Sequence, residues 1–117
     1  MGEAAKLFAA NAAWRTFGFR SAGRAVISGL SSPDENNRSI AGMFLVQAGR
    51  RAVPLLRREL EHPRNLPLTL RIIGDLGARE FLPELERYTA ADDPAVARAA
   101  RDAIESMGDD RAAWSNQ

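Results

Sequence analysis

The chain has 117 residues, of which 45% are apolar and 26% are charged, so it matches one folded globular domain and not a disordered segment. It has no cysteine, which excludes disulfide scaffolds, thiolate metal sites and cysteine nucleophiles, and no apolar run near the roughly 20 residues of a membrane-spanning helix, so we expect a soluble, cytoplasmic protein. The net charge of +1 conceals a net +5 over residues 1–64 and a net −4 over residues 65–117, a polarity that suits an oriented partner or head-to-tail stacking with a second copy.

Apolar spacing predicts helices throughout the chain and no sheet. The expected helices span roughly residues 3–17, 21–30, 33–48, 51–61, 66–76, 79–90 and 94–107. In the first helix, Trp14 lies on the apolar side with Leu7. Ser32, Pro33 and Glu35 form a predicted capping box at the start of the third helix.

The later helices differ in how much of their surface is apolar. The helices at 33–48 and 66–76 are apolar on most of their circumference, as expected of helices packed between neighbours. In the helix at 51–61, Val53, Leu56 and Leu60 are expected to face inward. The helix at 94–107 has a single apolar stripe, which is typical of a terminal repeat, and Trp114 in the following tail is expected to cover the edge of the core.

Proline and glycine recur along the chain at intervals of about thirty residues, which indicates an internal repeat. Two series of prolines are suited to the first turn of a helix: Pro33, Pro63 and Pro94, and Pro54 and Pro83. One series of glycines is suited to the end of a helix: Gly23, Gly49, Gly77 and Gly108. Asp93 is expected to cap the helix that Pro94 begins. The sequence therefore predicts a single domain over residues 1–117, built of helical hairpins at roughly 3–31, 33–62, 63–91 and 94–117.

The order of these markers across residues 20–108 identifies a family resemblance. The residues that carry it are Pro33, Arg38, Gly49, Ala52, Val53, Pro54, Leu56, Leu60, Pro63, Gly77, Leu82, Pro83, Leu85, Pro94, Arg98 and Gly108. This pattern resembles HEAT-like repeats of the short bacterial type called PBS-lyase HEAT-like repeats; Pro67 and the displaced Arg71 depart from it. The resemblance implies an all-α α-solenoid of antiparallel helical hairpins, with about three and a half repeats, of a kind that usually binds proteins. Some family members act on or around bilin chromophores, and distant relatives bind DNA.

The chain offers few groups for chemistry. His62 is the only histidine and precedes Pro63 at a helix boundary, where a solvated turn residue is expected. The carboxylates at Glu80, Glu84 and Glu86 lie near a helix start, where they complement the helix dipole, although a divalent ion or an acid–base pair is the alternative. No glycine-rich phosphate loop is present. We therefore expect no catalytic residue, no metal site and no cofactor.

Aromatic and basic residues alternate near the N-terminus of the sequence. The residues concerned are Trp14, Phe17, Phe19, Arg15, Arg20 and Arg24. We expect the aromatic rings to cover the edge of the core, because an end repeat must be shielded from solvent. A protein-contact patch, or a surface for nucleic acid or lipid, is the alternative.

The second helix of each hairpin provides the candidate binding surface, because these helices line the concave face of a solenoid. Aligning Pro54 with Pro83 gives a charged row that runs from basic to acidic, with one apolar position: Arg24, Arg51, Leu55, Arg58, Glu80, Glu84 and Arg87. A solvated charged face is the alternative interpretation.

These features together predict a protein that is not an enzyme. The leading hypothesis is a protein–protein interaction module or scaffold that binds a protein partner through the charged row. The alternatives are a bilin-lyase-like accessory protein, which only the family resemblance suggests, and a nucleic-acid-binding helical repeat that uses the basic half of the chain.

Overall fold

The structure, a computed structural model, describes the backbone of residues 2–18 and 20–115, and the side chains of these residues except 17 and 109–115. Within these ranges every regular element is a helix and no residue forms a strand, which confirms the predicted all-α class. None of the described helices combines the length and the apolar character that crossing a membrane requires.

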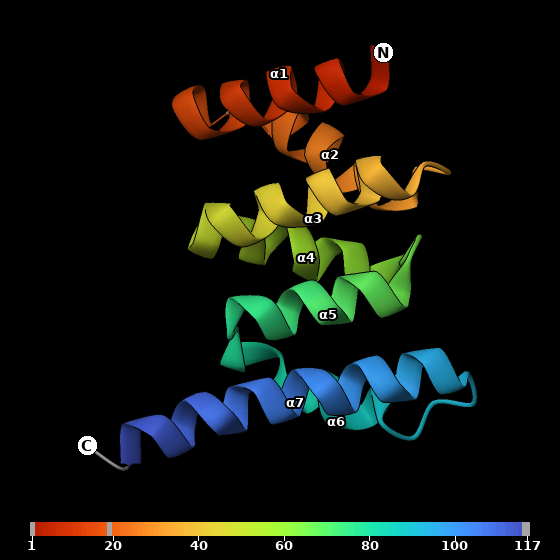
Figure 1. Cartoon of the computed structure of the whole chain (residues 1–117), viewed down its shortest axis with the longest axis vertical. Helices are drawn as coiled ribbons and strands as arrows, with labels where there is room; N and C mark the ends of the chain where they lie inside the picture. Colours follow the sequence, from red (N-terminus) through yellow and green to blue (C-terminus); the bar gives the residue numbers. More distant parts are fainter. Residues whose placement is uncertain (1, 19, 116–117) are drawn as a thin grey trace. The chain divides into compact units, whose positions relative to one another are not determined.

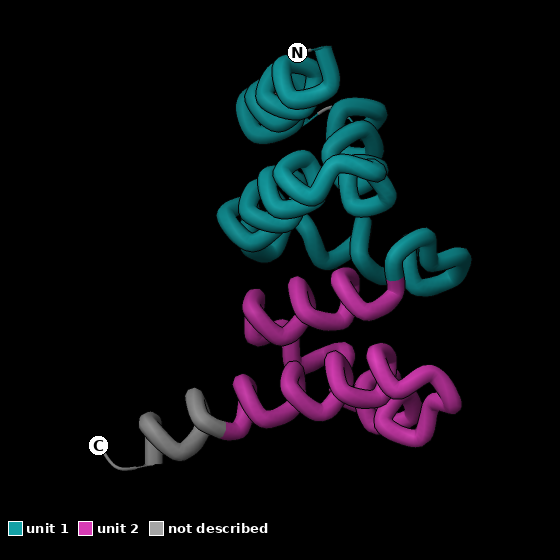
Figure 2. Tube along the Cα trace, turned by 45° about the vertical axis from the view of Figure 1, so that its right-hand side comes forward, with its two compact units in different colours: residues 1–65 teal, residues 66–117 magenta. Residues whose placement is uncertain are grey.

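The chain folds into two compact units, residues 1–65 and residues 66–117 (Figure 2). The first unit contains α1 (Gly2–Phe17), α2 (Arg20–Ser28), η1 (Gly29–Ser31), α3 (Glu35–Ala48), η2 (Gly49–Arg51) and α4 (Ala52–Glu61), where η marks a 3₁₀ turn. The net +5 of residues 1–64 belongs to this unit.

In the first unit each helix packs on its neighbours in the sequence. Helix α1 packs on α2 and α3, α2 packs on α3 and α4, and α3 packs on α4. Figure 1 shows α1 and α3 side by side. The core consists mainly of aliphatic and aromatic side chains: Leu7, Trp14, Val26, Ile27, Leu30, Ala41, Phe44, Leu45, Ala52 and Leu56. Burial of these side chains supplies most of the stability, since each large one contributes about 1.5–3 kcal/mol.

The glycines of the first unit serve two different purposes: some end a helix, and one allows two elements to pack closely. Gly49 has φ +62° at the end of α3, as a glycine that closes a helix should. Gly23 instead lies inside α2, within the helix predicted at 21–30, so the helix-ending role that the repeat pattern gave this glycine is wrong. A Cβ at Gly23 would lie 3.0 Å from Nε1 of Trp14, so the glycine allows the close approach of the indole. Gly18, with φ +71°, ends α1.

The start of α3 also differs from the prediction. The helix begins at Glu35, and its N-cap is Asp34, whose Oδ1 accepts a hydrogen bond of 2.8 Å from the N–H of Asn36. Ser32 lies outside the helix, where its hydroxyl oxygen accepts a bond from the N–H of Asp34. The predicted Ser32–Glu35 capping box is therefore wrong, because the carboxylate two residues later takes the capping position.

The second unit consists of α5 (Leu66–Leu76), η3 (Arg79–Phe81), α6 (Leu82–Tyr88) and α7 (Pro94–Ser115). Helix α7 packs on α5 and on α6. A Cβ at Gly74 would lie 2.7 Å from Cα of Ala103, so the glycine allows α5 to approach the backbone of α7 closely. The core contains Leu70, Ile72, Ile73, Phe81, Leu85, Val96, Ala100, Ala103 and Met107.

Helix α7 has the predicted start and a different end. Asp93 Oδ1 accepts a hydrogen bond of 2.9 Å from the N–H of Ala95, which confirms the predicted cap. The helix then continues through Gly108 to Ser115, so the helix end predicted at Gly108 is wrong. The prediction that Trp114 covers the edge of the core concerns a side chain outside those that the structure describes. Gly77, with φ +65° after α5, is a helix end as predicted.

Candidate functional site

The predicted binding row lies partly on the first unit, where Arg24, Arg51 and Arg58 are exposed. Arg24 belongs to α2, Arg51 to η2 and Arg58 to α4. Within the described residues, the guanidinium groups of Arg24 and Arg58 form no hydrogen bond or ion pair.

Leu55, the apolar position of the row, is half-buried. Its Cδ1 lies 3.2 Å from the point that a Cβ on Gly23 would occupy, so Leu55 packs α4 against α2. Arg51 lies four residues before Leu55, and Arg58 lies three residues after it. The two arginines therefore lie on the same helical face as Leu55, one on either side of this contact.

Three predicted residues belong to the second unit. Glu80 lies in η3, whereas Glu84 and Arg87 lie in α6. Glu80 and Arg87 are exposed and Glu84 is half-buried. In the part of the chain that the structure describes, no group of three or more histidine, aspartate or glutamate side chains has the geometry of a metal site. His62 is exposed and ends α4, as expected of a turn residue.

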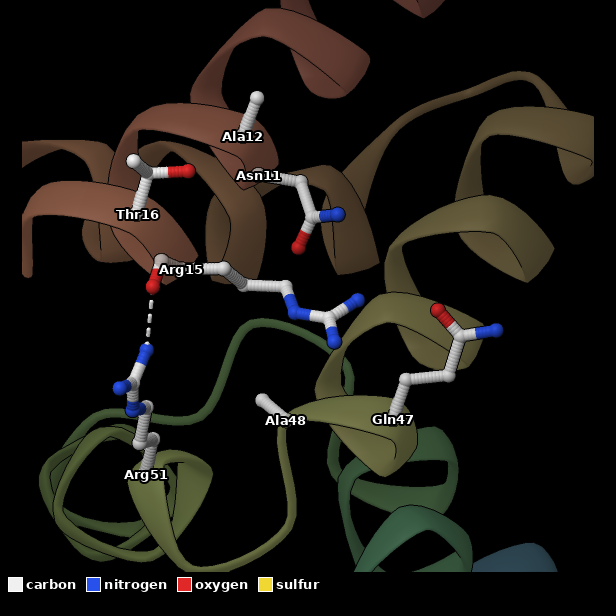
Figure 3. A pocket seen from close by; sticks show the side chains of 7 residues that line it. All are labelled: Asn11, Ala12, Arg15, Thr16, Gln47, Ala48 and Arg51. Carbon is white, nitrogen blue, oxygen red and sulfur yellow. Dashed lines mark hydrogen bonds between the residues drawn. The ribbon is translucent and has the colours of Figure 1, made fainter.

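An open cleft of about 530 Å³ lies on the first unit, between the C-terminal half of α1 and the end of α3 (Figure 3). Its lining comes from α1, α3 and η2: Asn11, Ala12, Arg15, Thr16, Gln47, Ala48 and Arg51. The cleft is accordingly lined mainly by polar groups. Its volume falls within the roughly 300–1,000 Å³ of small-ligand sites.

The cleft is electropositive, because two arginines and no acidic residue line it. Nη1 of Arg51 donates a hydrogen bond to the backbone carbonyl of Arg15, in the last turn of α1. This bond fixes Arg51 beside the cleft and uses one of the five N–H donors of its guanidinium. The guanidinium of Arg15 extends across the cleft toward Gln47 (Figure 3).

Asn11 is the most buried polar residue of the cleft, with 9% of its surface exposed. Its Oδ1 is shielded from solvent and accepts no hydrogen bond from a described group. The amide points into the cleft, toward the side where the Arg15 guanidinium lies (Figure 3). A buried acceptor without a donor costs about 1–3 kcal/mol. Such a cost marks Asn11 as a candidate for a functional role.

Two exposed apolar side chains lie one helical turn from residues of the cleft. Phe8 and Met43 are 54% and 46% exposed, the large apolar side chains with the most exposure among the described residues. The Phe8 ring packs edge-on against Phe44, with ring centroids 5.0 Å apart. Phe8 lies four residues before Ala12, and Met43 four residues before Gln47, so each shares a helix face with a cleft residue one turn away.

Sequence reasoning missed the buried carboxylate of Glu59, which is 5% exposed. Its two oxygens accept bonds from the backbone N–H, Nε and Nη2 of Arg64, the last at 2.9 Å. The hydrogen bond to Glu59 raises the pKa of Arg64, against the opposing effect of burial. This pair fixes the segment after α4, and its groups are satisfied within the chain. We therefore assign it a structural role.

No protein-family model, no curated protein and no solved structure matches this chain. The first unit thus has two candidate surfaces, the exposed arginines of α2, η2 and α4 and the polar cleft, and Arg51 of η2 belongs to both.

Proposed function

We propose that this chain is a non-catalytic protein-binding module of the HEAT-like helical-repeat type, with about three and a half repeats forming a solenoid. A recurring local arrangement supports this proposal. In each unit a glycine at positive φ stands at a 3₁₀ turn: Gly49 begins η2, and Gly77 lies two residues before η3. Each turn leads into a helix with a proline in its first turn, Pro54 or Pro83. The recurrence of this arrangement is what stacked helical hairpins require.

The partner in this proposal is an acidic protein surface. The observation that carries it is the pair Arg24 and Arg58, exposed on a unit of net charge +5, with guanidinium groups that pair with no described residue. Arginine is enriched at protein interfaces because its planar group makes several hydrogen bonds to carboxylates. The row Glu80, Glu84 and Arg87 in the second unit would provide a contact of mixed charge.

Charge reversal tests this surface. The Arg24→Glu, Arg58→Glu double variant is compared with the wild type in pull-downs from native extract, with each captured protein quantified by mass spectrometry. The matched control is Arg98→Glu, Arg101→Glu, which reverses two exposed charges on α7. We expect at least one protein to be captured by the wild type and the control but lost from the double variant.

Two results would count against this function. Identical sets of captured proteins for all three forms would remove the arginine surface from the interaction. Loss of every captured protein after nuclease treatment would show that nucleic acid bridges the chain to those proteins, which favours binding of nucleic acid by the basic unit.

A further inference from the structure

We propose that the cleft lined by Asn11, Arg15, Gln47 and Arg51 binds a ligand with a carboxylate next to a hydrogen-bond donor. This site goes beyond the protein-binding surface proposed above, because it lies between α1 and α3 and shares only Arg51 with that surface. Four observations specify the ligand: the two cations, the helix ends beside them, the buried amide of Asn11 and the adjoining apolar side chains.

The two arginines determine the charge of the ligand. Arg15 and Arg51 line the cleft with no acidic residue among their neighbours there. The guanidinium of Arg51 is held in place by its bond to the Arg15 carbonyl, so its remaining donors are already oriented. A planar guanidinium matches the two oxygens of a carboxylate with two parallel hydrogen bonds.

The helix ends favour a single negative charge over a double one. Helix α1 ends at Phe17 and α3 ends at Ala48, so both present C-terminal carbonyls near the cleft. The C-terminus of a helix carries about half a negative charge, which disfavours a phosphate dianion more than a carboxylate.

Asn11 is the reason why the ligand should carry a hydrogen-bond donor beside its carboxylate. Its Oδ1 is an acceptor without a donor, in a side chain that is nine-tenths buried and directed into the cleft (Figure 3). An N–H or O–H adjacent to the carboxylate of the ligand would satisfy this oxygen when the Arg15 side chain moves aside to engage the carboxylate. The α-amide of an acylated amino acid has this arrangement of groups.

The apolar side chains define the rest of the ligand. Phe8 and Met43 are exposed one helical turn before the cleft residues Ala12 and Gln47. An aliphatic side chain on the residue that bears the carboxylate would cover them. The same chemistry comes from two sources, the C-terminal residue of a polypeptide and a free N-acylated amino acid.

Titration calorimetry with defined probes tests the proposal. The probes are N-acetyl-leucine, N-acetyl-leucinamide, inorganic phosphate, and the peptide Ala-Ala-Ala-Ala-Leu with either a free or an amidated C-terminus. We expect the free carboxylates to bind at least about tenfold more tightly than the amides, the ratio for one charged hydrogen bond. A peptide that binds at least tenfold more tightly than N-acetyl-leucine identifies a polypeptide C-terminus as the source, whereas equal affinities identify the free acid.

Variants connect the binding to the cleft. Arg15→Ala keeps the backbone carbonyl that Arg51 contacts, and Asn11→Leu keeps the bulk of the side chain, so both retain the local packing. We expect each to weaken the free-carboxylate probes at least about fivefold, while Arg20→Ala, an exposed arginine outside the cleft, leaves the affinity unchanged. Circular dichroism checks that each variant is folded.

Three results would overturn the proposal. The first is equal affinity, or equal absence of binding, for the carboxylate and amide forms of a probe. The second is phosphate binding at least as tight as carboxylate binding. The third is a folded Arg15→Ala variant with the wild-type affinity, which would place the anion elsewhere on the basic unit. None of these results bears on the pull-down test of Arg24 and Arg58, so the two proposals fail separately.

Discussion

Replacing Asn11 with leucine should stabilise the protein while it impairs the cleft. Leucine has a similar size and no polar atom, so the variant removes a buried acceptor that costs about 1–3 kcal/mol when it lacks a donor. Leucine also has the higher helix propensity, by roughly half a kcal/mol. We therefore expect the free energy of unfolding to rise by about 1–3 kcal/mol.

The expected change can be expressed as a melting temperature. Unfolding entropy near 2.1 cal/mol/K per residue, applied to 117 residues, gives a shift of roughly 4 °C for each kcal/mol. Asn11→Leu should accordingly raise the midpoint by about 4–12 °C in thermal unfolding followed by far-UV circular dichroism. Asn36→Leu, at an exposed position of α3, is the control and should change stability by less than about 0.5 kcal/mol. A lower midpoint for Asn11→Leu would refute the reasoning, since it would mean that the amide stabilises the fold.

Four further substitutions test the packing of α7, the cap of α3 and the Glu59–Arg64 pair, each measured by urea unfolding. Gly74→Ala should lower the free energy of unfolding by about 1–3 kcal/mol, because its Cβ would lie 2.7 Å from a backbone atom of α7. Gly108→Ala, with open space around it, should raise the free energy of unfolding by about 0.5–1 kcal/mol. Equal effects of the two variants would contradict the close approach of α5 and α7. Asp34→Ala should cost about 1 kcal/mol through loss of the cap, and no change would place the capping role elsewhere. Arg64→Ala should cost about 1–3 kcal/mol, because the buried Glu59 loses the guanidinium and keeps only the backbone N–H of residue 64, and a neutral result would show that solvent replaces the arginine.

The sequence predicted most helix positions, because proline and glycine act locally. The helix at 66–76 has the predicted bounds, and Gly49 and Gly77 close helices as expected. Glycine also has a second use, the close approach of two elements, which depends on residues distant in the sequence. Gly23 makes room for Trp14 in this way, and no local pattern distinguishes that use from a helix end.

Buried polar groups were harder to predict than apolar ones. We expected Val53, Leu56 and Leu60 to face inward in α4, but Val53 and Leu60 are half-buried and Glu59 takes a fully inward position. The carboxylate is tolerated there because Arg64, five residues later, donates to it. The sequence did contain a signal for this buried pair: a glutamate on the apolar side of a helix, followed by an arginine across the turn.

The cleft combines residues that the sequence analysis placed in different groups. Arg51 belonged to the predicted binding row, whereas Arg15 belonged to the aromatic and basic segment near the N-terminus of the sequence. Their contact joins residues 36 positions apart, which depends on how α1 packs on α3 and cannot be obtained from spacing. Asn11 gave a weak signal, since it lies four residues after Leu7 and three before Trp14, on the buried side of α1.

The central claim, that the basic unit binds carboxylates at the cleft, is tested most directly by NMR of ¹⁵N-labelled arginine side chains. N-acetyl-leucine is added to the full chain, and the Nε–H signals are assigned through single arginine-to-lysine variants. We predict that the signals of Arg15 and Arg51 move saturably with one common dissociation constant, while those of Arg24 and Arg58 stay in place. Equal, non-saturating movement of all four signals would contradict the claim, because it would show that acids interact with the positive surface without a defined site.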